Sequence, residues 1–191
     1  MVTATIEREA TLRRETLDAY FARVRAATLA LVAGLAPEDS VVQSMDDASP
    51  VKWHLAHTTW FFETFVLAPF ARNYRRFHEG YDFLFNSYYQ LVGPMYRRAD
   101  RGLLSRPTLA EILAYRAHVE EAVANLLRED DAGEIALRVT LGCEHEQQHQ
   151  ELIATDLKHA FSHNPLAPAW RELPPPGTRA PPPAGWRKFD G

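Results

Sequence analysis

The chain has 191 residues, 46% hydrophobic and 24% charged, with a formal net charge of -4, which fits one globular domain and gives no electrostatic footprint for nucleic acid. The single cysteine, Cys143, excludes an internal disulfide framework. No apolar run is long enough to span a membrane, and the first residues include acids where a secretory signal needs an apolar centre. We therefore expect a soluble, cytoplasmic protein that binds neither nucleic acid nor a membrane.

Apolar periodicity predicts two helices in the first part of the chain. The first covers residues from about 6 to 35, where apolar side chains recur every three or four positions. The second has Ser49 as a candidate N-cap and Pro50 at its first helical position, and it runs to Pro69.

Two further helices are predicted in the second part. The third begins at Thr108, which forms a capping box with Glu111 three residues later. The fourth begins after Asp131 and ends at Pro165. Because no run alternates in the manner of a β-strand, the sequence predicts an all-α protein, an antiparallel four-helix bundle.

Two segments do not fit the short turns of a bundle. About forty aromatic-rich residues separate the second and third helices, and a loop of this length in a compact domain is usually functional. From Pro165 onward the chain is rich in proline, which is typical of a semi-extended linker. We therefore divide the chain into a domain at residues 1–164 and a linker at residues 165–191.

The stretch HEQQH places His145 and His149 one helical turn apart, so that both imidazoles can reach one metal ion. Such a short motif also arises by chance, and with Glu146 after the first histidine it fits a zinc protease, in which that carboxylate is the general base. The second helix adds His54 and His57 in apolar surroundings, where a buried imidazole needs a partner. One of these two histidines could complete the site, or be a hydrogen-bonded core residue; the spacing does not decide.

Other candidates are weaker. His159 and His163 are also four residues apart, but polar neighbours at the helix end indicate surface residues. Cys143 is interpreted as a small buried residue rather than a ligand or nucleophile. Three neutral histidines are compatible with zinc or with non-haem iron, and bond lengths of about 2.0 to 2.2 Å require ligating nitrogens within about 4 Å of each other.

Four longer strings occur in one order: SPVKWHLAHTTWFFETF, LFNSYYQLVGP, RGLLSRPTLAEILAYR and HEQQHQELI. Together they cover most of residues 49 to 155. In these strings the chain resembles the N-terminal, DinB-like domain of the ergothioneine-biosynthesis sulfoxide synthases (EgtB). The resemblance implies that ferrous iron, Fe(II), is held by His57, His145 and His149, with His54 as a neighbour.

The resemblance also implies a reaction and its substrates. Members of that family join cysteine or γ-glutamylcysteine to the imidazole carbon of hercynine with O2, giving a sulfoxide. Gln148 would then hydrogen-bond hercynine, while Arg98 and Arg101 would pair with carboxylates of the sulfur donor, a role that suits the guanidinium group. From the residues alone, these arginines could equally be solvated or paired with Asp82 and Asp100.

Full-length family members continue into a second domain of the sulfatase-modifying-factor type, which supplies a catalytic tyrosine and much of the hercynine pocket. The sequence ends about where that domain would begin, so we do not expect the chain to be active by itself; it is a fragment, a truncated gene product or half of a split enzyme. Ovothiol and selenoneine synthases share the architecture. The alternatives are a DinB-like metal-dependent thiol transferase or hydrolase, and a non-catalytic bundle that binds a partner.

Overall fold

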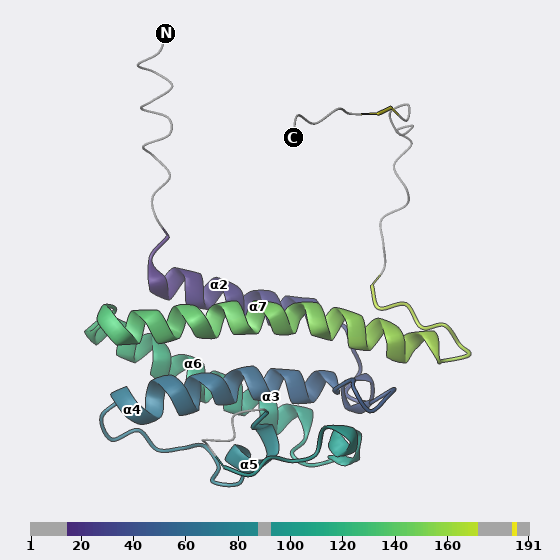
Figure 1. Ribbon diagram of the computed structural model, residues 1–191, viewed down its shortest axis with the longest axis horizontal. Helices are drawn as coiled ribbons and strands as arrows, with labels where there is room; N and C mark the ends of the chain where they lie inside the picture. The colour runs from purple at the N-terminus through teal and green to yellow at the C-terminus, as the bar shows by residue number, and fades with distance from the viewer. Residues whose placement is uncertain (1–14, 88–92, 172–184, 187–191) are drawn as a thin grey trace.

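The computed structural model describes residues 15–87, 93–171 and 185–186, and within these ranges the chain is helical, with no strand. Figure 1 shows four long helices, which are α2 (Leu17–Val32), α3 (Val51–Phe62), α6 (Leu109–Glu129) and α7 (Gly133–Ser162). The shorter elements are a 3₁₀ turn η1 (Asp39–Val41), a π-helical turn η2 (Glu63–Leu67), α4 (Ala68–Phe70), α5 (Tyr81–Phe85) and a 3₁₀ helix η3 (Arg98–Leu103). No helix in the described ranges is long and apolar enough to cross a membrane.

The long helices do not alternate in direction along the chain. Helices α2 and α7 run the same way, while α3 and α6 run the opposite way (Figure 1). The neighbours α3 and α7 are therefore antiparallel, but α2 and α7 are parallel. This arrangement differs from the expectation that the packed helices would be antiparallel throughout.

The long segment between α4 and α6 explains this topology. It carries the chain back along the domain, so that α6 begins beside the beginning of α3, where the Lys52 ammonium group donates to the Leu104 carbonyl at 2.7 Å. The segment is thus a crossover connection, as found in bundles whose successive helices do not all form hairpins. It is not structureless, because it contains α5 and η3.

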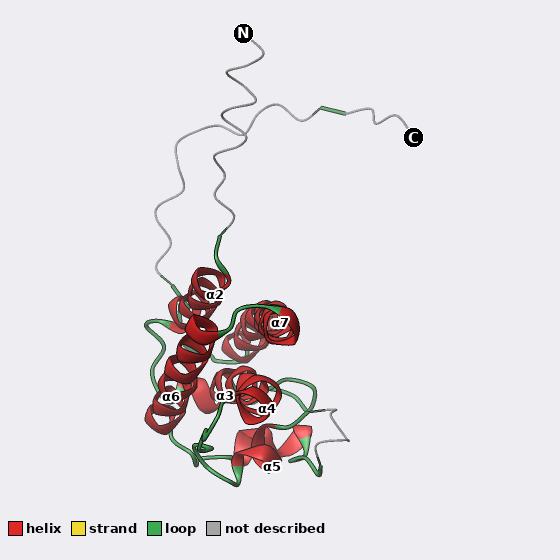
Figure 2. Cartoon of the chain, turned by 90° about the vertical axis from the view of Figure 1, so that its left-hand side faces the viewer, coloured by secondary structure: helices red, strands yellow, loops and turns green. Residues whose placement is uncertain are grey.

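Helix α3 is the central helix of the fold. All twelve of its residues are buried, because α6 and α7 pack against it and α5 with the crossover segment lies beyond it (Figure 2). The helix begins at Val51 with Pro50 as N-cap residue, rather than Ser49 as predicted. It continues through the π turn to Phe70, one residue past Pro69. Polar side chains on α3 must therefore find partners inside the protein.

The other boundaries follow the sequence in part. The sequence predicts the first helix from about residue 6 to residue 35, whereas α2 covers only Leu17–Val32. Residues 1–14 lie outside the described ranges. The capping box of α6 is confirmed, because the Glu111 N–H donates to the Thr108 hydroxyl and the Thr108 N–H donates back to the Glu111 carboxylate.

The first residues of the predicted proline-rich linker lie on the domain. Trp170 packs against the hydrophobic core, and its indole N–H donates to the Leu31 carbonyl at 3.1 Å. The described part of this segment therefore lies against the end of α2, and the division of the chain into a domain and a linker at residue 165 stays a prediction. Residues 172–184 and 187–191 lie outside the described ranges.

Candidate metal centre

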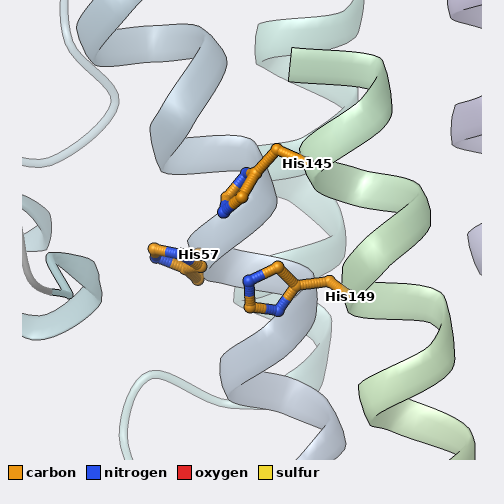
Figure 3. Close-up of side chains that lie close together, drawn as sticks. All are labelled: His57, His145 and His149. Atoms are coloured by element: carbon orange, nitrogen blue, oxygen red, sulfur yellow. The ribbon is translucent and has the colours of Figure 1, made fainter. Parts of the chain in front are cut away.

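Three histidines from two facing helices point into one space (Figure 3). His57 comes from α3 and His145 and His149 come from α7, and one nitrogen from each lies within 4.8 Å of the others. This limit is wider than the roughly 4 Å expected around a bound ion, where bonds of about 2.1 Å hold nitrogens about 3.0 to 3.4 Å apart. The three nitrogens would move closer together around an ion, and the three histidines could then hold a metal.

The hydrogen bonds around the rings test whether these histidines fit a metal. The Nδ1 atom of His57 lies 2.6 Å from the Phe85 carbonyl oxygen. A carbonyl only accepts, so His57 carries its proton on Nδ1 and keeps the lone pair on Nε2. The buried Nδ1 atom of His145 has no hydrogen-bond partner among the described residues. A metal-binding histidine normally uses one nitrogen for the ion and the other for a hydrogen bond, which His57 satisfies.

The surroundings keep these imidazoles neutral. Burial, reinforced by the neighbouring imidazole of His145, places the pKa of His57 well below its ordinary value. Burial lowers the pKa of His145 to about 4. Burial and the neighbouring rings also lower the pKa of His149. Metal ions bind the neutral form of histidine, so at neutral pH no proton must leave before a metal enters.

A cavity of about 250 Å³ opens beside the histidines. It brings together all six site residues that the sequence suggested, together with five others. The six are His57, Arg98, Arg101, His145, Gln148 and His149, and the others are Ser49, Trp53, His54, Ser87 and Leu152. The volume lies just below the range of about 300 to 1,000 Å³ that is usual for ligand sites.

The two arginines are held in different ways. Arg101 is buried, with its guanidinium 3.4 Å from the centre of the Trp53 ring, and it donates to the Ser49 and Ser87 hydroxyls at 2.9 and 3.1 Å. Arg98 is partly exposed and donates to the Asp47 carbonyl. The suggested pairing of these two with Asp82 and Asp100 is wrong, since those carboxylates bind Arg76 and Arg97.

Glu146 points away from the cavity. Its fully buried carboxylate accepts from Arg25 at 2.8 Å, Arg116 at 3.0 Å and the Thr28 hydroxyl at 2.6 Å, between α7, α2 and α6. Burial opposes its ionisation, but the two guanidinium groups and the hydroxyl outweigh this effect and lower the pKa of Glu146. A carboxylate held in this way cannot reach a metal-bound water on the other face, which contradicts the zinc-protease alternative. Glu146 is also not exposed to solvent, and its carboxylate accepts from guanidinium and hydroxyl groups rather than from an imidazole.

The family model of the DinB superfamily matches residues 20–164, which is most of the chain. The chain belongs to the DinB superfamily. No curated protein matches it. Members of the DinB superfamily are often metal-dependent enzymes, and the three histidines of this DinB domain could form such a site, although their chemistry alone does not choose the metal.

The remaining candidates of this DinB domain lie outside the cavity. His159 is hydrogen-bonded to the Ser44 hydroxyl at 2.8 Å and lies 3.3 Å from exposed His163, so only His163 is fully at the surface as expected. Cys143 is buried, as predicted, and burial raises the pKa of its thiol to about 12. A thiol of this kind is a packing residue rather than a nucleophile.

Two features of the cavity were missed in the sequence. Trp53 lies on α3, Ser49 lies just before that helix and Ser87 lies in the crossover segment, so no local pattern links them. Asp156 lies beside His54, which itself contacts His149. A signal for Asp156 existed, since a spacing of seven residues places it on the same face of α7 as His149.

Proposed function

We propose that this DinB domain is the iron-binding part of an ergothioneine-type sulfoxide synthase, which joins hercynine to cysteine or γ-glutamylcysteine with O2. The observation that carries the proposal is the composition of one cavity. The three-histidine cluster shares it with Arg98, Arg101 and Gln148, the residues to which the resemblance assigns substrate contacts.

Ferrous iron bound by His57, His145 and His149 would supply further coordination positions and O2 chemistry at the mouth of this cavity. The protein's contribution is to hold three neutral imidazoles together. His57 is oriented by the Phe85 carbonyl at 2.6 Å and stacks between the rings of Trp53 and Trp60. These contacts leave the ring little freedom, which favours a defined ligand position.

Arg101 is suited to bind a carboxylate of the sulfur donor. Ser49 and Ser87 hold its two terminal nitrogens and Trp53 covers its face, so the guanidinium is oriented before any ligand arrives. A fixed guanidinium loses little freedom on binding a carboxylate through charge-assisted hydrogen bonds. Gln148 is exposed on the cavity side of α7, next to the ligand His149, where its carboxamide can hydrogen-bond the second substrate.

A second domain of the sulfatase-modifying-factor type, in the same polypeptide or in a separate chain, would complete the hercynine pocket. The cavity of about 250 Å³ is small for two substrates, and Gln148 and Leu152 at its edge are exposed. Ovothiol and selenoneine synthesis remain within the same proposal, because the residues of this cavity do not distinguish their substrates.

Metal binding is the first test. The chain is reconstituted anaerobically with Fe(II), and its affinity is measured by competition with a chelator. Single changes of His57, His145 or His149 to alanine should weaken binding on the order of 100-fold or more, since loss of an outer partner alone costs about 10- to 100-fold. His163→Ala, on the exposed end of α7, is the matched control and should bind as the wild type does.

The reaction is the second test. O2 uptake is measured with hercynine and γ-glutamylcysteine, with and without a separately expressed second domain. Uptake that needs both substrates supports the proposal. The superfamily match also fits a metal-dependent thiol transferase or hydrolase, and turnover of a thiol-transfer substrate without O2 would establish that alternative instead. If the chain binds metal but turns over no substrate, whether or not the second domain is added, it is a binding module.

A further inference from the structure

Two buried residues, His54 and Asp156, continue from His149 into the protein, and His54 also lines the cavity. The Nδ1 atom of His149 is 2.8 Å from Nδ1 of His54, and Nε2 of His54 is 3.1 Å from the carboxylate of Asp156. The same carboxylate oxygen accepts the backbone N–H of Ser49 at 2.8 Å. His54, His149 and Asp156 are each more than nine-tenths buried. The contacts form one continuous chain from a carboxylate to a histidine of the candidate metal centre.

The chemistry of the partners determines where each proton lies. Burial raises the pKa of Asp156, but the hydrogen bonds from His54 and Ser49 outweigh burial and lower it, so the carboxylate is ionised and can only accept. His54 must therefore donate from Nε2. A neutral imidazole has one proton, so Nδ1 of His54 is an acceptor. The proton between the two rings then belongs to Nδ1 of His149.

His54 must be neutral for this assignment to hold. His54 is 2% exposed, and a single proton on its Nε2 atom satisfies both of its contacts, the one to Asp156 and the one to His149. A cationic His54 would donate from both nitrogens, and His149 would have to accept at Nδ1 and carry its own proton on Nε2. The lone pair that faces the other histidines would then be blocked.

The assigned tautomer of His149 is not the one that histidine prefers in water, where a neutral imidazole favours the proton on Nε2. The neighbouring ligand His57 is held in the same Nδ1–H form by a different acceptor, the Phe85 carbonyl. Two of the three ligands therefore have the proton on Nδ1 and the lone pair on Nε2. His54 cannot itself be a ligand in this arrangement, because both of its nitrogens have partners.

We propose that Asp156 and His54 form a positioning relay that holds His149 in its Nδ1–H tautomer, so that its Nε2 atom is the one that binds the metal. The relay acts through His149, and neither of its residues is a metal ligand in this arrangement. The inference rests on the proposed metal centre for its purpose, but the tautomer itself exists without a metal. Outer partners of this kind fix the orientation of a ligating imidazole and raise its basicity.

The first experiment uses the metal-free chain, so it does not depend on the proposed function. Long-range ¹H–¹⁵N correlation spectra at neutral pH distinguish protonated from unprotonated ring nitrogens. The relay predicts a protonated Nδ1 in His149 and a protonated Nε2 in His54. A His149 ring protonated on Nε2 would overturn the relay, whatever the metal affinity.

The second experiment measures Fe(II) and Co(II) affinity by chelator competition. His54→Phe and Asp156→Leu should each bind about 10- to 100-fold more weakly than wild type. Asp156→Asn should lose less, because its carbonyl oxygen can still accept from both His54 and Ser49. His159→Phe is the control, since its ring bonds Ser44 outside the cavity. Thermal melting of each metal-free variant shows whether it is folded.

The outcomes separate the two proposals. Folded His54→Phe and Asp156→Leu chains that bind as tightly as the control would overturn the relay while leaving the metal centre in place. A wild-type chain with the expected tautomers that binds no divalent metal would overturn the proposed function and the ligating role of His149 with it. A larger loss of metal affinity in Asp156→Leu than in Asp156→Asn supports the relay.

Discussion

His145 and Glu146 are neighbours in the sequence but face different sides of α7, because consecutive residues of a helix point about 100° apart around its axis. The imidazole of His145 lines the cavity beside α3, and the carboxylate of Glu146 lies between Arg25 and Arg116 at 2.8 and 3.0 Å. One polar stretch thus serves two purposes. Its histidines form the candidate metal centre, and its glutamate balances the two buried arginines on the other side of the helix.

We predict that Glu146→Gln destabilises the protein by about 3 kcal/mol or more, because it leaves two buried guanidinium groups with less compensating charge. Iron affinity of the folded variant should stay near that of wild type. Urea denaturation measures the first effect and chelator competition the second. The matched control is Glu144→Gln, an exposed residue bonded to Tyr20, for which we expect a loss below about 1 kcal/mol. Equal losses for the two variants would contradict the buried network.

The metal-free protein should lose stability as the pH falls from about 6.5 to 4. His145 has a pKa lowered to about 4 in the folded protein, so it binds fewer protons than in the unfolded chain across this window. For each proton that the unfolded chain binds and the folded protein does not, the free energy of unfolding falls by about 1.4 kcal/mol per pH unit on acidification. His145→Gln should flatten the slope by up to that amount. Gln148→Ala, which changes the same cavity without removing a titrating group, should not.

Gln148→Ala should weaken hercynine binding without changing iron affinity. A hydrogen bond of about 1 to 1.5 kcal/mol corresponds to a loss of roughly 5- to 10-fold. Gln147→Ala is the control, because Gln147 is partly buried, contacts Tyr20 and does not line the cavity. Calorimetric titration of the iron-loaded chain with hercynine, in the presence of the second domain, measures the hercynine affinity of both variants. Identical hercynine affinity in the two variants would remove Gln148 from the substrate site.

Gly142→Ala should destabilise the domain, although this substitution usually stabilises the interior of a helix. A Cβ atom there would lie 2.5 and 2.7 Å from two ring atoms of Phe62 on α3. Overpacking of this kind costs about 1 to 3 kcal/mol. Because His145 is three residues away, metal affinity should also fall. Thr140→Ala, at an exposed position of α7, is the control for urea denaturation and metal titration. If Gly142→Ala changes stability and metal affinity no more than Thr140→Ala does, the close packing of Gly142 on Phe62 does not limit the separation of the two helices.

Local features of the chain were predictable from the sequence. The capping box of Thr108 and Glu111 forms as expected, because both partners lie within one turn of the same helix. The pairing of His145 with His149 is local for the same reason, since four residues complete about one turn. The all-helical content also follows from apolar periodicity along each segment.

Tertiary structure decided what local spacing could not. His54 and His57 lie on the same buried helix, and the packing of α3 against α7 determined which of them faces the two histidines and which lies between His149 and Asp156. The direction of α6, and with it the inward position of Glu146 beside Arg116, depends on the crossover connection. These contacts join residues far apart in the sequence, so their free energies depend on how whole helices pack, which no short pattern encodes.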